Sequence, residues 1–222
     1  MIQNIPKIDI HKKQEWSLHR DNIIKDFPES EFSNFKLKWL EIIQRIDNVN
    51  ELIHQLFIDF QILNMQIKES VIEDEIFKTP LYYKQKFLTE QIFYWIRKTV
   101  DEIISIIYVL EYLKTNSQYP KIIKIDCIGK LINSKEFILN IKEKHIATFN
   151  IINDISNTYK HSFMNSEIHA YIGEKDPLIF SYGFKNNNLE KNPIFTQYKM
   201  EDIITDLNSL INDFIIYIKE KT

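Results

Sequence analysis

The chain has 222 residues, of which 44% are hydrophobic, and its 28 basic and 31 acidic residues give a formal net charge of −3. Such a chain can bury a sizeable core, and its balanced charge gives no global electrostatic argument for nucleic-acid binding. With 3 glycines and 6 prolines, it lacks the many tight turns that sandwiches and barrels need. We therefore expect long helices joined by few loops, not an all-β fold.

The cellular location is predicted from three features of the chain. Residues 1–20 are polar and lack the apolar core of a secretory signal. The most apolar stretch, Ile103–Leu110, is too short to span a bilayer. The single cysteine, Cys127, cannot form an internal disulfide, which favours a reducing compartment. We expect a cytoplasmic protein without membrane association.

In chain order, residues 1–29 are predicted to form an N-terminal arm, because prolines punctuate them and apolar residues are sparse. The remainder, 30–222, is predicted to be one helical domain. Its first long helix is expected to begin between Ser30 and Ser33 and to reach about Lys68, since apolar residues recur there in steps of three and four. Pro80 opens a second long helix. Apolar residues on more than one of its faces make this helix central.

The second half of the chain adds shorter elements. A helical piece is expected over about 125–133, and Ser134 is predicted to cap a long helix that runs from 135 to 164.

Turn signals then introduce two short strands, 178–184 and 194–198, which form a hairpin. Because an isolated hairpin is marginally stable, we expect it to lie on the helices. The last helix is expected over about 200–219. The predicted fold is all-α, an up-down bundle of four long helices plus short helices and a small β-hairpin before the last helix.

One helix end carries a polar stripe that suggests chemistry. Its members follow one another in steps of four, three and four, which places them on one helical face: Asn150, Asp154, Asn157 and His161. Lys160 flanks the stripe and disfavours protonation of the adjacent imidazole, and a neutral imidazole is a general base. Asn157 offers hydrogen bonds to a phosphate or ribose oxygen, and Lys160 offers positive charge. On spacing alone, a solvated helix face is the commoner interpretation.

Other motifs favour no cofactor and no metal. Glu51 and His54 have the Glu-x-x-His spacing of di-iron bundles, but that site needs a second such motif and two further carboxylates. No glycine-rich phosphate loop is present. The second helix interleaves aromatic residues with Lys84, Lys86 and Arg97, a pattern that suits base stacking, although core and dimer contacts are the commoner use. These aromatics are Tyr82, Tyr83, Phe87, Phe93, Tyr94 and Trp95.

The string from Asn157 through Thr, Tyr, Lys160 and His161 to Ser162, late in a helical domain, resembles the signature region of HEPN domains. That superfamily comprises four-helix-bundle proteins, often dimeric, and includes many toxin and antiviral ribonucleases. Its active members carry an arginine, about four to six intervening residues and a histidine, often as Arg-Asn-x-x-x-His. Alignment on Asn157 and His161 puts Ser156 at the arginine position. Asp154 and Ile155 occupy the other permitted positions, so no spacing restores the arginine.

The resemblance implies metal-independent attack of a ribose 2′-OH on the adjacent phosphate, at sites that meet across a homodimer. On this basis His161 is the general base, Asn157 positions the substrate, and Lys160 takes the place of the missing guanidinium. Asp154 lies about 10 Å from His161 along the helix axis, so it is expected to support the site only across a dimer or through substrate.

Two functions stay open at this point. The first is an RNA-binding endoribonuclease of an antiviral-defence or toxin–antitoxin system. The second is a non-catalytic helical bundle that assembles with a protein or nucleotide partner. The placement of Lys160 favours the first function, and the missing arginine favours the second.

Overall fold

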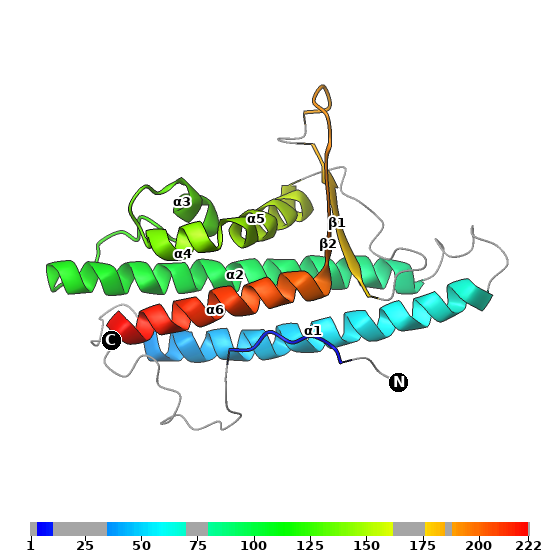
Figure 1. The fold of residues 1–222 in the computed structure, drawn as a ribbon, viewed down its shortest axis with the longest axis horizontal. Coiled ribbons are helices and arrows are strands. Elements are labelled where there is room, and N and C mark those ends of the chain that lie inside the picture. The colour runs from blue at the N-terminus through cyan, green and yellow to red at the C-terminus, as the bar shows by residue number, and fades with distance from the viewer. Residues whose placement is uncertain (1–3, 11–34, 70–79, 162–175, 185–187, 222) are drawn as a thin grey trace.

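The computed structural model describes residues 4–10, 35–69, 80–161, 176–184 and 188–221. Helices α1 (Phe35–Glu69) and α2 (Pro80–Asn116) run antiparallel, and α6 (Met200–Lys221) lies along them (Figure 1). The shorter elements are α3 (Ile128–Asn133), α4 (Leu139–Lys144), α5 (Ile146–His161), β1 (Leu178–Gly183) and β2 (Ile194–Lys199). The prediction of a mainly helical fold with a hairpin before the last helix is confirmed.

The prediction of one long helix over 135–164 is wrong. Ser134 closes α3 instead of opening the next helix, Ile138 adopts a left-handed φ of 41°, and His145 ends α4. The described helices α1, α2 and α6 have 35, 37 and 22 residues, whereas α5 has 16. The described part of the chain therefore does not contain the four long helices that its periodicity indicated.

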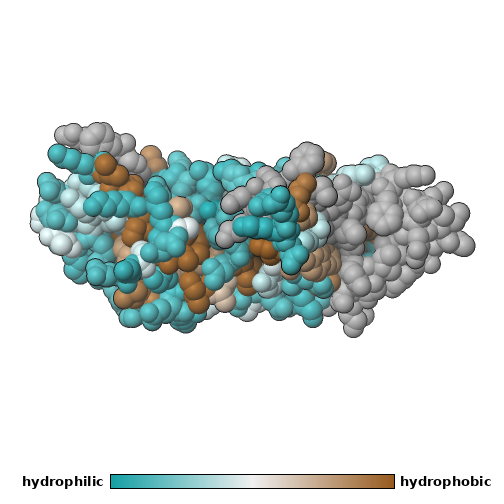
Figure 2. Space-filling model, turned by 90° about the horizontal axis from the view of Figure 1, so that it is seen from above, coloured by the Kyte–Doolittle hydropathy of each residue, from teal (hydrophilic) through white to brown (hydrophobic). Residues whose placement is uncertain are grey.

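Helix α2 is central, as its apolar pattern predicted. It contacts α1 on one side and α5 and α6 on others. Ile103, Ile104 and Ile107 are fully buried in its middle. Burial of each such side chain contributes roughly 1.5–3 kcal/mol to folding. Seen from the side of α3, α4 and α5, the described surface is mostly hydrophilic, with hydrophobic bands between (Figure 2). No helix in the described ranges combines the length and apolar character needed to cross a membrane.

The hairpin stands across the helices near the end of α5 (Figure 1). β1 and β2 are antiparallel, with Leu178 opposite Lys199 and Gly183 opposite Ile194. β1 is largely buried and β2 is largely exposed. The Tyr159 hydroxyl of α5 donates to the Phe180 carbonyl over 2.7 Å. Both predicted strands are confirmed, and the hairpin rests on the helices as its marginal size required.

Residues 4–10, part of the predicted N-terminal arm, pack against α1 and α6. Ile8 and Ile10 are buried. Asn50 of α1 accepts from the Ile8 amide over 2.8 Å and donates to the Ile8 carbonyl over 3.0 Å. Asn208 of α6 makes a similar pair with the Asp9 amide and the Lys7 carbonyl. This segment is attached more firmly than its composition indicated, and residues 11–29 of the arm lie outside the described ranges.

Candidate functional site

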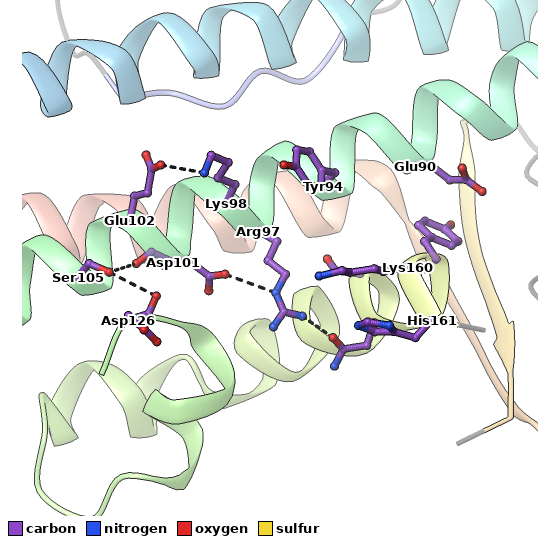
Figure 3. Close-up of a pocket in the computed structure, with 13 residues that line it drawn as sticks. Glu90, Tyr94, Arg97, Lys98, Asp101, Glu102, Ser105, Asp126, Lys160 and His161 are labelled. Atoms are coloured by element: carbon purple, nitrogen blue, oxygen red, sulfur yellow. Dashed lines mark hydrogen bonds and ion pairs between the residues drawn. The ribbon is translucent and has the colours of Figure 1, made fainter. Parts of the chain in front are cut away.

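A cleft of about 580 Å³ lies along the outer face of α2 and is flanked by the C-terminal half of α5 (Figure 3). α2 lines it between Glu90 and Ser105, and α5 lines it between Ser156 and His161. Asp126, which precedes α3, closes one end. Two helices and a loop that are far apart in sequence therefore build one concave site.

Three of the predicted site residues come together in this cleft, and one does not. Asn157, Lys160 and His161 line it. Asp154 does not belong to its described lining; that side chain is exposed and accepts a hydrogen bond from Asn153 over 3.3 Å. A role for Asp154 in this chain's own cleft therefore has no geometric support.

The position of the stripe follows from the opposite face of α5. Phe149, Ile152 and Ile155 are fully buried against the rest of the bundle. Ser156 is also buried, and its hydroxyl donates to the Phe93 carbonyl of α2 over 3.4 Å. Because apolar burial fixes the rotation of α5, the polar face that carries Asn157 must turn outward.

Arg97 of α2 is the site residue that sequence spacing did not reveal. Its Nη1 donates to Asn157 Oδ1 over 2.7 Å and to the Asn153 carbonyl over 3.3 Å. Its Nε lies 3.5 Å from Asp101 Oδ2. In Figure 3 the guanidinium reaches from α2 across to α5. A guanidinium has five N–H donors, so donors remain for an anion in the cleft.

The amino-acid composition contained one signal for Arg97. Of the 28 basic residues, only Arg20, Arg45 and Arg97 are arginines. Arginine differs from lysine in its planar, bidentate donor geometry. In a chain whose cations are almost all lysine, the few arginines are therefore the first candidates for specific hydrogen bonding.

The carboxylates at the other end of the cleft already have partners. Glu102 binds Arg45 over 2.7 Å and Lys38 over 3.0 Å. Burial alone would raise the pKa of Glu102, but these hydrogen bonds outweigh it and hold the pKa below its usual value. Asp126 pairs with Lys130 over 2.9 Å.

Asp101 has a different environment. Its carboxylate accepts from the Ile128 amide, at the start of α3, over 2.7 Å. Burial raises the pKa of Asp101 despite that hydrogen bond and the nearby Arg97. Asp101 thus links α2, the start of α3 and the Arg97 guanidinium in one network. Of the three carboxylates at this end of the cleft, Asp101 alone has a raised pKa, so its charged form is the least favoured.

The opposite end of the cleft carries the groups suited to phosphate chemistry. Lys160 and His161 are exposed at the C-terminus of α5, one turn beyond Asn157. Together with Arg97 and Asn157 they supply two cations, an imidazole and an amide. Cations and amides bind phosphate oxygens, and an imidazole moves protons near neutral pH.

Glu51 and His54 belong to no larger cluster of metal-ligating side chains in the described part of the chain. Both side chains are exposed on α1. Across the residues that the structure describes, no three His, Cys, Asp or Glu side chains gather in an arrangement that could hold a metal ion.

Comparisons of the chain with protein-family models, curated proteins and solved structures find no match. The HEPN assignment therefore stays a prediction from the residues of α5.

Proposed function

We propose that the protein is a HEPN-like RNA-binding protein that cleaves RNA without a metal, in an antiviral-defence or toxin–antitoxin setting. One observation supports this most directly. The Arg97 guanidinium lies 2.7 Å from Asn157, in the cleft that Lys160 and His161 also line. Arg97 of α2 thus lies beside the motif of α5, which has no arginine of its own.

In the proposed reaction, the His161 imidazole accepts the proton of a ribose 2′-OH. The 2′ oxygen bonds to the adjacent phosphorus, the bond from phosphorus to the 5′ oxygen breaks, and this leaving oxygen takes a proton from solvent. The products are a 2′,3′-cyclic phosphate and a 5′-hydroxyl. Arg97 and Lys160 stabilise the added negative charge on the phosphoryl oxygens, an effect typically worth ~10²–10³ in rate. Asn157 holds the guanidinium and offers its amide N–H groups to the substrate.

The proposal includes a homodimer in which the clefts of two copies face each other. This part rests on the resemblance to HEPN domains. Asp154, which is exposed, would support the site only if such a dimer or a bound substrate brought it to a cleft. Sedimentation of the purified protein measures the dimer directly, independently of cleavage.

A second candidate function is non-catalytic assembly with a protein or nucleotide partner. The existing contacts of Arg97 favour it, because Asn157, the Asn153 carbonyl and Asp101 already engage that guanidinium. An arginine held in this way stabilises the contact between α2 and α5 without any substrate. Assembly without cleavage is therefore the outcome that would replace the nuclease proposal.

Cleavage of labelled RNA by purified protein, with EDTA present, tests the proposal. We expect wild-type protein to produce 2′,3′-cyclic phosphate ends and His161→Ala to lose this activity. His54→Ala, which removes an exposed histidine from α1, is the matched control and should cleave like the wild type. Equal cleavage by His161→Ala and wild type would exclude the catalytic role of His161.

A further inference from the structure

β2 is an edge strand whose outer side is open. The two-stranded sheet has the order β1-β2, and among the described residues no strand pairs with the far side of β2. Ile194 and Phe195 are 52% and 56% exposed, and Gln197 and Lys199 are also exposed. Natural edge strands are commonly blunted by prolines, bulges or charges. β2 has a continuous register and one charge, at its last residue, so its edge can accept another strand.

One hydrogen bond fixes the direction of the backbone groups along β2. The Met200 amide donates to the Pro177 carbonyl over 3.1 Å, which extends the register of the hairpin by one pair. Hydrogen-bonded and non-hydrogen-bonded pairs alternate along antiparallel strands. The N–H and C=O groups of Phe195, Gln197 and Lys199 therefore point away from β1. Such a row of outward donors and acceptors is complementary to the edge of another strand.

The other edge of the hairpin is covered by α5. The same alternation directs the Phe180 carbonyl away from β2, and this carbonyl accepts the hydrogen bond from Tyr159. β1 therefore lies between the Tyr159 hydroxyl and β2. The upper part of the hairpin also extends beyond the helices (Figure 1). The open edge is thus the one remote from Tyr159.

We infer that β2 pairs antiparallel with β2 of a second copy of this chain, across a two-fold axis at Gln197, to form a four-stranded sheet. Outward-pointing residues must stand opposite one another for their backbone groups to bond. An axis at Gln197 sets Phe195 of each copy opposite Lys199 of the other. All three outward residues of both copies then take part.

The neighbouring registers fit less well. An axis at Thr196 would set Lys199 opposite Pro193, which has no N–H to donate. An axis at Tyr198 would move Phe195 beyond the end of the other β2. An axis at Lys199 would bring the two ammonium groups directly opposite each other, which is unfavourable. The edge is therefore self-complementary in one register.

Charge favours a second copy as the occupant of this edge. Lys199 is the only charged residue of β2, and the inferred axis brings its ammonium beside the exposed Phe195 ring of the other copy. A cation over an aromatic ring is attracted to it. The same axis directs Lys191, which is exposed before β2, toward the first turn of α6 in the other copy, where Glu201 and Asp202 are exposed. Each of these contacts forms twice.

This contact differs from the cleft-to-cleft dimer of the proposed function. Because α5 lies on the β1 side of the hairpin, pairing through β2 places the two α5 helices on opposite sides of the four strands. Pairing through β2 also does not depend on RNA cleavage. The two contacts are therefore measured by different variants.

Opposite charges at position 195 test the pairing by sedimentation velocity over a dilution series. Phe195→Lys and Phe195→Glu both remove the ring that stacks on Phe180, so each loses the same contact within its own hairpin. We expect Phe195→Lys to raise the Kd of the dimer about 10-fold, because its ammonium meets Lys199 of the other copy. Phe195→Glu should keep a Kd near that of the wild type, because its carboxylate meets the same ammonium.

Proline at the axis tests the backbone hydrogen bonds. Gln197→Pro removes an N–H that points outward, and proline is accepted at edge positions of this kind. We expect this variant to be monomeric, with the helical circular dichroism of the wild type. Thr196→Pro is the contrasting variant, because it removes an N–H that points toward β1 and should lower the melting temperature.

Disulfide formation tests the register. In a Cys127→Ser background, which removes the single native thiol, we expect Gln197→Cys to form a covalent dimer under mild oxidation. Its two copies stand opposite each other with Cα atoms about 5.5 Å apart, within the reach of a disulfide. Lys199→Cys is the matched control and should stay uncrosslinked, because its copies are about 14 Å apart along the strands.

A wild-type protein that stays monomeric over the dilution series would overturn the inference. A dimer that both Phe195→Lys and Gln197→Pro leave intact would also overturn it, and would assign the dimer to another surface. Equal Kd values for Phe195→Lys and Phe195→Glu, or crosslinking of Lys199→Cys in place of Gln197→Cys, would contradict the register. RNA cleavage that persists in monomeric Gln197→Pro keeps the inference and shows that the nuclease does not need this dimer.

Discussion

Arg97 and Asn157 are 60 residues apart in the chain, yet a 2.7 Å hydrogen bond joins them across α2 and α5. This bond orients the guanidinium toward the end of the cleft that holds Lys160 and His161. The geometry needs both helices, because Arg97 reaches α5 only when the apolar face of α5 packs on α2.

Replacement of Arg97 by lysine should separate the effect of the positive charge on RNA cleavage from the effect of the planar guanidinium. Lysine keeps the positive charge but lacks the planar fork that contacts Asn157 and Asp101 together. We expect Arg97→Lys to reduce RNA cleavage about 10²-fold while the protein stays folded. Lys130→Arg, on an exposed lysine paired with Asp126, is a matched exchange and should leave cleavage unchanged. Full activity of Arg97→Lys would show that charge alone suffices.

Introduction of an arginine at position 156 should destabilise the protein instead of completing the motif. Ser156 is 8% exposed, and its hydroxyl contacts the Phe93 carbonyl. A guanidinium at that place must either be buried without a partner or push α5 away from α2, at a cost of several kcal/mol. We expect Ser156→Arg to lower the urea midpoint of unfolding and to add no cleavage activity. Thr158→Arg, at a half-buried neighbour, should unfold near the wild-type midpoint.

Much of the fold follows from local pattern. Apolar steps of three and four, together with Pro80, placed the first residues of α1, α2 and α6 within a few positions of those observed. Turn residues and short apolar runs placed β1 and β2. These elements were predictable because each depends on the periodicity of its own sequence.

The unpredicted features depend on tertiary contacts. The break between α4 and α5 places His145 where its imidazole meets Asp213 of α6, 68 residues later. Arg97 reaches the site because α2 packs against α5, and the spacing of residues within α5 gives no sign of that contact. Asn50 and Asn208 attach residues 4–10 by side-chain amides, and no apolar pattern signals such bonds. Each of these features needs two segments to be placed before it can be recognised.

The hydrogen bond between Tyr159 of α5 and the hairpin should contribute measurably to the stability of the protein. Burial raises the pKa of this phenol, with a smaller contribution from Glu90. The hydroxyl donates to the Phe180 carbonyl, so Tyr159 stays neutral in the folded protein at alkaline pH. We expect Tyr159→Phe to lower the free energy of unfolding by about 1 kcal/mol, because the buried carbonyl loses its donor. Tyr83→Phe, on an exposed ring, should have no measurable effect on the same urea curve.

Acid should weaken the contact between the α4–α5 junction and α6. Burial alone would raise the pKa of Asp213, but hydrogen bonds from Lys144 and His145 outweigh it and lower the pKa below 3.8. A depressed pKa contributes stability above the unfolded value, and that contribution is lost as pH falls through the folded value. We expect Asp213→Asn to be about 1 kcal/mol less stable than wild type at pH 7. The difference should begin to shrink below about pH 4, the unfolded value, and should disappear only once the pH has fallen through the lowered folded value, where both proteins carry a neutral side chain.

The control for the acid experiment is Asp206→Asn, an exposed carboxylate on the same helix. Its unfolding free energy should follow the wild-type curve at every pH. A gap between wild type and Asp213→Asn that stays constant from pH 7 to pH 3 would show that shape, and not charge, stabilises the junction.

Removal of the Asn50 amide should detach residues 4–10 from α1. The side chain both accepts from and donates to the backbone of Ile8, so Asn50→Ala leaves two backbone groups without partners beside a buried isoleucine. The expected cost is about 1–3 kcal/mol in urea unfolding. Amide hydrogen exchange should show faster exchange at Ile8 before the helices unfold. Asn192→Ala, at an exposed position before β2, should leave both measurements unchanged. Unaltered exchange at Ile8 in Asn50→Ala would assign the attachment to apolar packing alone.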